Sequence, residues 1–203
     1  MSLPLLVIFA GPPCSGKTTL ARWLAKELVL PLVAKDDMKE SLFDSLGWND
    51  REWSKKLGRA TIALMFYFVE TELSAGRSLI VESDFDAQSA TRTFLELKFK
   101  FPFEPLQIQC QSDGQVLVER FKKRAESGMR HPGHVDHLTY EEMRQVLLTG
   151  KSERLDIGGT TVEVDTTDFQ KLDQAGLLNT IRLHLEWNTP AKKHSRTFPW
   201  STV

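Results

Sequence analysis

A continuous apolar run near the N-terminus constrains the fold of this chain more than any other feature. Residues 5–10, LLVIFA, contain no polar side chain, and a glycine and two prolines follow them at once. A short run of this kind predicts a β-strand that is buried on both faces. Leu20, Leu24 and Leu28 then recur at helical spacing, and Pro31 closes that segment. The chain therefore opens with a strand, a loop and a helix.

The same alternation continues along the chain. The sequence predicts further strands at residues 32–34, 78–81, 106–110 and 161–164. It predicts helices at residues 37–75, with a break near Gly47, and at 88–98, 115–125, 140–148 and 169–187. Strands that alternate with helices indicate an α/β fold, in which a parallel sheet carries helices on both faces. We expect one domain over residues 1–187 and a polar tail over residues 188–203.

The charge balance predicts no basic field over the chain as a whole, so any anion must be bound by local groups. The chain has 203 residues, with 26 Lys and Arg against 27 Asp and Glu, and its formal net charge is -1. This balance argues against a nucleic acid or an anionic membrane as the partner of the whole chain. Two cysteines, Cys14 and Cys110, are too few for a disulfide framework and favour a reducing compartment. With no visible targeting segment or membrane-spanning run, we expect a cytoplasmic protein.

The loop after the first strand matches a phosphate-binding motif. Residues 11–19, GPPCSGKTT, fit the pattern G-x-x-x-x-G-K-S/T at every fixed position. Gly11 and Gly16 permit backbone turns that aim N–H groups at phosphate oxygens, and the following helix adds its positive end. Lys17 is expected to reach the β- and γ-phosphates, and Thr18 to ligate Mg²⁺. The other residues expected to contact the nucleotide are Pro12, Pro13, Cys14, Ser15 and Thr19.

This loop occurs in switches, motors and kinases, so other features must choose among them. No N-K-x-D guanine-reading motif follows a later strand, and no L-S-G-G-Q transporter signature is present. The stretch AKDD at residues 34–37 resembles the guanine-reading motif in its letters. It follows the second strand, however, which is the wrong part of the fold for that motif. A small kinase is therefore the favoured interpretation.

The chain resembles the small P-loop kinases of the polynucleotide kinase, zeta toxin and chloramphenicol phosphotransferase type, within the AAA-type ATP-binding proteins. More loosely, it is similar to nucleoside monophosphate and shikimate kinases. The resemblance covers Leu5 to about Trp187 and is carried by the loop and by the stretches VAKDDMKESLF, SLIVESDFDAQSATR and ERFKKRAESGMRHPGHVDHLTYEE. It implies a five-stranded parallel sheet of order 2-3-1-4-5 with a short lid at about residues 120–138. It also implies ATP- and Mg²⁺-dependent transfer of phosphate to a hydroxyl group of a small molecule or nucleotide.

The resemblance assigns the first of these stretches to the phosphate acceptor. It implies that Asp36, at the end of the second strand, accepts the proton of the attacking hydroxyl, and that Asp37 and Lys39 contact the acceptor. The alternative is that both aspartates cap a helix that starts near Met38. The family often has arginine where this chain has Lys39, and lysine cannot form the bidentate fork of arginine.

The second stretch supplies acidic groups near the metal. Glu82 and Asp84 are expected just past the third strand, with Glu82 near Mg²⁺ and Asp84 near the acceptor, and Arg92 is a further acceptor candidate. The alternative is that these acids are solvated strand ends.

The third stretch corresponds to the lid. Arg120 and Arg124 are four residues apart on one helix face, and the resemblance implies that they close over the nucleotide. Arg130, His131 and His134 are candidates for contacts with phosphate or with the acceptor. With His134 and His137, His131 also forms a weak zinc-like pattern.

Past the fifth strand, the resemblance implies that Asp165, Thr166 and Thr167 lie near the adenine, with helix capping by Asp165 or Thr167 as the alternative. Two other functions stay open. One is a nucleotide-binding ATPase or switch that acts on a partner protein. The other is a nucleic-acid 5'-hydroxyl kinase, for which a basic groove would contain Lys98, Lys100, Lys122 and Lys123.

Overall fold

The central strand, β1 (Leu5–Ala10), is buried at every residue, as its apolar sequence predicts. In the computed structural model, which describes residues 3–187, β1 pairs in parallel with β3 (Leu79–Glu82) and β4 (Glu104–Gln111). The edge strands are β2 (Leu32–Ala34) and β5 (Thr160–Asp165), and the five-stranded parallel sheet has the order β2-β3-β1-β4-β5. The predicted fold class and strand order are confirmed. The predicted tail at residues 188–203 lies outside the described residues.

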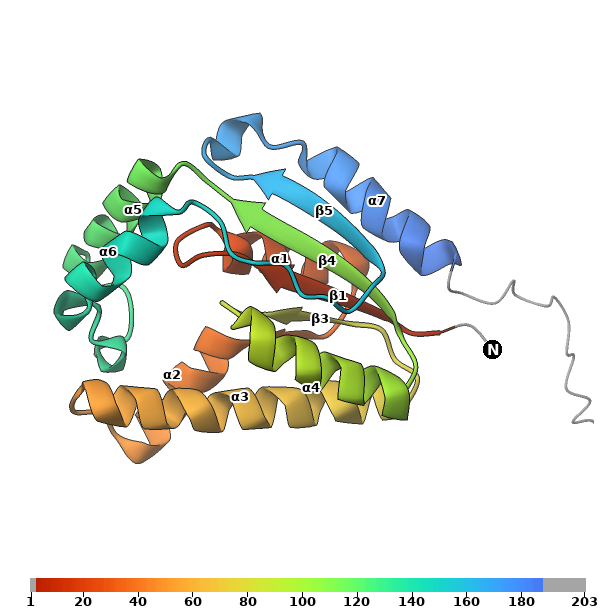
Figure 1. Ribbon diagram of the computed structural model, residues 1–203, viewed down its shortest axis with the longest axis horizontal. Helices are drawn as coiled ribbons and strands as arrows, with labels where there is room; N and C mark the ends of the chain where they lie inside the picture. The colour runs from red at the N-terminus through yellow and green to blue at the C-terminus, as the bar shows by residue number, and fades with distance from the viewer. Residues whose placement is uncertain (1–2, 188–203) are drawn as a thin grey trace, which may run out of the picture.

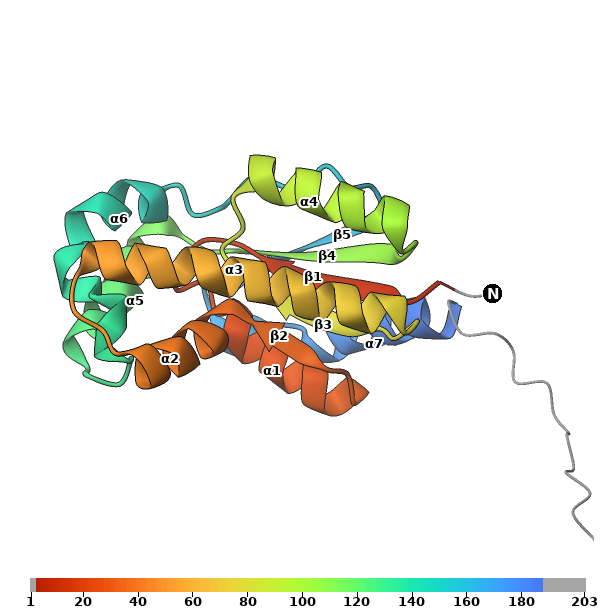
Figure 2. The ribbon, with the colours of Figure 1, turned by 90° about the horizontal axis from the view of Figure 1, so that it is seen from below.

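Helices cover both faces of the sheet because successive side chains of β1 point in opposite directions. Alternate residues of β1 pack with α3 (Arg51–Ser74) and α4 (Ala87–Lys100) in one hydrophobic cluster. The residues between them pack with α1 (Lys17–Leu28) and α7 (Gln174–Trp187) in a second cluster. Figure 2 shows α4 and α1 on opposite sides of the strands. The apolar run of β1 therefore holds the two layers of helices together.

The remaining helices lie toward the carboxyl ends of the strands (Figure 1). α2 (Lys35–Leu46) follows β2 directly, and α5 (Gly114–Glu126) follows β4. Two 3-10 turns, Pro132–His134 and Asp136–Leu138, lead from α5 to α6 (Tyr140–Leu148), which packs on α5 in a small third cluster. Open α/β sheets bind ligands at this edge.

Two helices begin two or more residues away from their predicted starts. α2 starts at Lys35 instead of residue 37, so Asp36 lies in its first turn. The predicted helix over residues 169–187 is a 3-10 turn at Phe169–Lys171 followed by α7. The carboxylate of Asp173 accepts a hydrogen bond from the backbone N–H of Gly176 at 2.8 Å, which fixes the start of α7. Within residues 3–187, no helix combines the length and the apolar character needed to cross a membrane.

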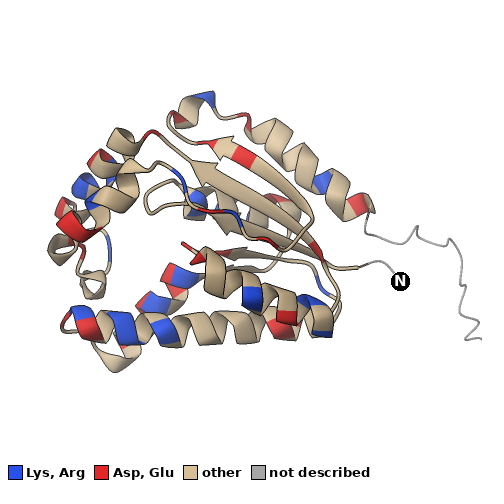
Figure 3. Ribbon diagram, viewed as in Figure 1, with Lys and Arg blue, Asp and Glu red and all other residues tan. Residues whose placement is uncertain are grey.

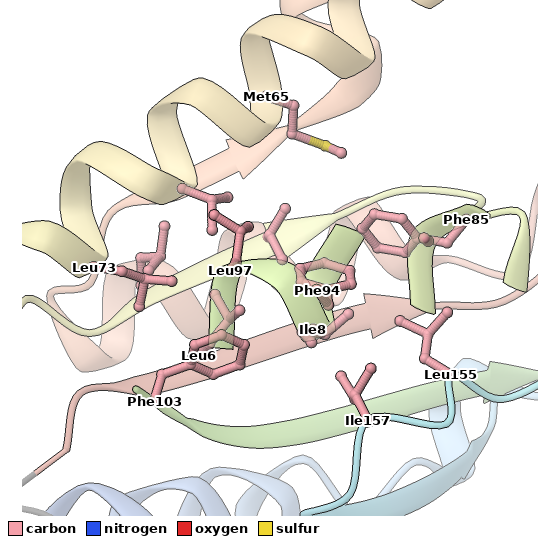
Figure 4. Close-up of a cluster of buried hydrophobic side chains, with 14 of the residues drawn as sticks. Leu6, Ile8, Met65, Leu73, Phe85, Phe94, Leu97, Phe103, Leu155 and Ile157 are labelled. Atoms are coloured by element: carbon pink, nitrogen blue, oxygen red, sulfur yellow. The ribbon is translucent and has the colours of Figure 1, made fainter. Parts of the chain in front are cut away.

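Phe94 lies at the centre of the first hydrophobic cluster (Figure 4). Its ring centroid is 5.0 Å from that of Phe66 and 5.4 Å from that of Phe85, and its side chain is 0% exposed. Ile157, from the segment that precedes β5, reaches the same cluster. This one ring therefore connects α3, α4 and the sheet.

We predict that Phe94→Ala lowers the free energy of unfolding by about 3–5 kcal/mol, because the substitution leaves a cavity that its neighbours cannot fill. Urea unfolding followed by circular dichroism measures the change. Phe99→Ala is the matched control, since Phe99 lies on the same helix and is 92% exposed. Equal losses in the two variants would contradict the central position of Phe94.

Candidate active site

The phosphate-binding loop joins β1 to α1 and needs glycine at both fixed positions. A Cβ on Gly11, where φ is +141°, would lie 2.3 Å from the carbonyl oxygen of Cys110. A Cβ on Gly16, where φ is +80°, would lie 1.9 Å from the ring of Phe169. Both values are far below van der Waals contact, so the close packing of the loop depends on these two residues.

Lys17, Thr18 and Glu82 come together at the start of α1. The Lys17 Nζ donates to the carbonyl oxygen of Pro12 at 2.9 Å and lies 3.9 Å from Glu82 Oε1. The Thr18 hydroxyl donates to Glu82 Oε2 at 3.1 Å. Burial raises the pKa of Glu82, and the nearby Lys17 ammonium opposes this effect. Glu82 is the last residue of β3 and is buried, so the alternative of a solvated strand-end acid is wrong for it.

The hydroxyl of Thr18 and the carboxylate of Glu82 fit the oxygen ligands that Mg²⁺ prefers, with water and phosphate oxygens as the remaining ligands. Across residues 3–187, no group of three or more His, Cys, Asp or Glu side chains is arranged to hold a metal ion. The zinc-like pattern of the three histidines therefore finds no support. His131 lies 3.2 Å from Asp44 and stacks on Phe43, whereas His137 is exposed.

Asp36 faces a cavity at the carboxyl edge of the sheet, and its carboxylate pairs with Arg130 Nη2. Burial raises the pKa of Asp36, but the Arg130 guanidinium and other cations outweigh this and lower it to about 2. Asp37 points elsewhere and pairs with Arg22. Neither aspartate caps α2, because the residue at the helix start, Ala34, has no side-chain capping bond and both aspartates lie in the first turn. The capping alternative is therefore wrong.

Arg130 belongs to the segment predicted as the lid and connects this segment to α2 through Asp36. Its Nη1 lies 3.0 Å from Asp136 Oδ2, which also accepts a hydrogen bond from Arg124 Nε at 3.1 Å. The Nε2 of His134 lies 3.0 Å from Glu40 of α2. Burial, followed by the charge of Arg130, lowers the pKa of His134 to about 3, so this imidazole is neutral at physiological pH. The segment is held against α2 by three polar contacts, which are those of Arg130 with Asp36, His131 with Asp44 and His134 with Glu40.

Arg120 lies on α5 and reaches the loop after β5. Its Nη2 donates to the carbonyl oxygens of Thr166 and Thr167, each at 2.9 Å, and its guanidinium lies 5.2 Å from the ring centroid of Phe169. Its Nη1 is buried without a partner among the described residues. Arg120 therefore lines the cavity and keeps one buried donor atom without a partner among the described residues.

Several predicted residues do not line the cavity. Arg92 is exposed on α4 and lies 4.0 Å from Glu96. The Asp165 carboxylate accepts from the N–H of Thr167, and the Thr166 hydroxyl donates to the carbonyl oxygen of Gln111. The lining also omits Gly11, Pro12, Ser15, Asp37 and His131.

The basic groove expected from four lysines does not form along the cavity, because its lining omits Lys98, Lys100, Lys122 and Lys123. Lys98 instead donates to the carbonyl oxygen of Ile157, and Lys100 pairs with Glu70.

The cavity has a volume of about 910 Å³. The predicted residues that line it are Pro13, Cys14, Gly16, Lys17, Thr18, Thr19, Asp36, Lys39, Glu82, Asp84, Arg120, Arg124, Arg130 and His134. Sequence reasoning missed Lys35, Arg51, Lys55, Arg59, Asp136 and Phe169. The four-residue spacing of Arg51, Lys55 and Arg59 was a signal that these side chains share one helix face.

The Cys14 thiol has a pKa raised by burial, which argues against a nucleophilic role.

Comparison with known proteins identifies the family and the fold of this chain. Residues 6–148 match a family model described as an AAA domain. A crystal structure of a candidate kinase from Chloroflexus aurantiacus has a TM-score of 0.84 and 38% identity, and covers 93% of this chain and 100% of that one. The Mycobacterium tuberculosis APS kinase in complex with AMPPNP and APS has a TM-score of 0.55, with 92% and 99% coverage. Its 12% identity indicates a shared fold alone.

The curated relatives match over a shorter segment. Mouse (Mus musculus) adenylate kinase 8 is 31% identical over 68 residues, which make up 34% of this chain and 14% of that protein. The chain therefore spans only a small part of the length of the curated relatives it matches. The family match and the full-length structural match establish that the chain belongs to the AAA domain family and has the fold of the small P-loop kinases.

Proposed function

We propose that this protein is an ATP- and Mg²⁺-dependent phosphotransferase that moves the γ-phosphoryl group of ATP to a hydroxyl group. The observation that carries the proposal is that Asp36 lines the same cavity as Lys17, Thr18 and Glu82. A triphosphate site alone would serve a switch or an ATPase equally well. A carboxylate beside that site is what a hydroxyl acceptor requires.

The loop binds the donor. Its backbone N–H groups and the Lys17 ammonium hold the phosphates, while Thr18 and Glu82 hold Mg²⁺. Mg²⁺ held by these two residues would neutralise the charge that develops on the phosphate oxygens. Arg120 and Arg124 supply fixed positive charge from α5 to the same oxygens.

Asp36 orients the acceptor and takes its proton. The acceptor oxygen forms a bond to the γ-phosphorus while the bond from this phosphorus to the bridging oxygen breaks, and ADP leaves with that electron pair. With a pKa of about 2, Asp36 is a weak base, and its main contribution is alignment of the hydroxyl. This suits a loose transition state, in which the attacking oxygen keeps its proton until late in the reaction.

A phosphate oxygen is the second candidate acceptor. The observation in its favour is the local likeness to adenylate kinase 8. Such an acceptor is already ionised and needs no base, so loss of the Asp36 carboxylate would leave its phosphorylation nearly unchanged.

We predict that Lys17→Ala weakens binding of a non-hydrolysable ATP analogue by about 10- to 100-fold, since charge-assisted hydrogen bonds contribute about 1.5–3 kcal/mol. Isothermal titration calorimetry with Mg²⁺ present measures the affinity. Lys26→Ala is the control, because Lys26 is exposed in the last turn of the same helix. Unchanged affinity in the Lys17 variant would sink the nucleotide part of the proposal.

We predict that Asp36→Asn slows acceptor-dependent ADP release by about 10²- to 10⁴-fold, the usual contribution of a positioned base, and leaves ATP-analogue binding intact. A screen of hydroxyl compounds for ADP release above the acceptor-free rate supplies the assay. Asp37→Asn is expected to retain activity, because Asp37 pairs with Arg22 outside the cavity. Release that no acceptor stimulates would favour the ATPase or switch instead.

We predict that Arg130→Met moves the acid limb of the pH dependence of kcat/KM to higher pH. In the wild type, the pKa of about 2 keeps Asp36 ionised throughout the usual assay range. Without the guanidinium, burial acts with less opposition and raises this pKa, so the base becomes protonated as pH falls. Matching acid limbs in the variant and the wild type would show that Arg130 does not set the ionisation of Asp36.

A further inference from the structure

The cavity is far more basic than the chain as a whole. Nine Lys and Arg side chains line it against four Asp and Glu side chains, although the formal net charge of the chain is -1. In Figure 3, Lys and Arg gather along the N-terminal part of α3, whereas α2 carries both Lys and acidic residues. The nucleotide site itself uses Lys17, Arg120 and Arg124. Most of the remaining positive charge therefore lies on the acceptor side, where α2 and α3 form the wall.

Lys39 of α2 is the buried cation of this wall. Only 8% of the residue is exposed, and its Nζ donates to the Ser54 hydroxyl of α3 at 2.9 Å. Among residues 3–187, no carboxylate lies within 4.0 Å of this ammonium, which instead sits 5.2 Å from the ring centroid of Phe43. A buried charge without a counter-ion is costly unless a ligand supplies one.

α3 adds further cations on the same side. Arg59 lines the cavity and has no ion pair or hydrogen bond with any other described residue. A Cβ on Gly58 would lie 3.7 Å from Lys39 Nζ, which shows that the ammonium lies against this stretch of α3. Arg51 and Lys55 share the cavity face but already pair with Glu142 and Glu52. Within the part of the chain that the structure describes, Lys39 and Arg59 are thus the two acceptor-side cations without a carboxylate partner.

We infer that the phosphate acceptor is an anionic alcohol, a small hydroxyl compound whose phosphate, sulfate or carboxylate group binds to Lys39, Ser54 and Arg59. The inference rests on the proposed function and names its substrate class. Lys39 follows Asp36 by three residues on α2, a rise of about 4.5 Å along the helix. A hydroxyl at Asp36 and an anionic group at Lys39 would therefore be separated by only a few bonds.

The test uses the full chain saturated with Mg²⁺ and a non-hydrolysable ATP analogue, so that the phosphate-binding loop is occupied. Calorimetric titrations with inorganic phosphate, sulfate, glycerol 3-phosphate, glycerate and glycerol then report on the second site. We expect one or more of the anions to bind and glycerol to bind far more weakly. The comparison of phosphate, sulfate and carboxylate probes identifies the preferred anionic group.

Arg59→Gln and Lys39→Met are each expected to weaken binding of the best anion by about tenfold or more, because each removes a charge-assisted hydrogen bond. Lys56→Gln is the matched control. Lys56 is exposed on the same helix, lies over the ring of Trp53 and does not line the cavity. Arg59 is exposed, so its variant keeps the test valid even where Lys39→Met fails to fold.

The ionisation of Lys39 gives an independent readout. Burial, followed by the nearby Lys35, Arg130 and Arg51, lowers the pKa of Lys39 to about 8, with Asp36 opposing the change. Anion affinity should therefore fall as pH rises through about 8, because the ammonium loses its charge, and Lys39→Met should remove this dependence.

The outcomes separate the two proposals. If the analogue binds and no anion does, or if Arg59→Gln and Lys56→Gln behave alike, the anionic acceptor is overturned while the phosphotransferase stands. If the analogue fails to bind, the proposed function is overturned, and anion titration of the Lys39 and Arg59 variants still decides the second site. Tighter binding of a 5'-hydroxyl oligonucleotide than of every small anion would assign the site to nucleic acid and overturn the small acceptor.

Discussion

The register of three neighbouring strands determines where the chemistry of this protein is placed. Glu82, the last residue of β3, pairs with Phe9 of β1 and with Ala34 of β2. The phosphate-binding loop follows β1 and Asp36 follows β2, so both segments start beside the same carboxylate. This register is held by the apolar side chains of β1, which are buried on both faces. A change that moved β3 by one residue would point Glu82 to the other face and separate it from Thr18.

Much of the fold and the donor side of the site could be predicted from the sequence, because both depend on local patterns. The strands and helices follow from hydrophobic periodicity, and the phosphate-binding loop has a nearly fixed spacing of glycine, lysine and threonine. Gly11 and Gly16 show why that spacing is strict, since any Cβ there would overlap neighbouring atoms. The position of Asp36 also followed from its place after a strand, although its role remains a prediction.

The acceptor side could not be predicted to the same extent, because it depends on contacts between distant segments. Arg130 meets Asp36 across 94 positions of sequence, and neither residue carries a local signal of the other. His131 stood next to Arg130 in the sequence, yet it contacts Phe43 and Asp44 of α2 and does not line the cavity. The basic face of α3 could not be predicted from the net charge either, because acidic residues elsewhere in the chain balance its cations.

The ion pair of Asp36 with Arg130 explains how a weak base can still serve this reaction. The guanidinium lowers the pKa of Asp36 and so reduces its power to take a proton, but it also fixes the carboxylate at the cavity wall. Phosphoryl transfer needs alignment more than basicity. Arg130 is itself held by Asp136, which also binds Arg124 of α5. The same short network therefore connects the proposed base to an arginine on the nucleotide side, so alignment of acceptor and donor depends on one set of charges.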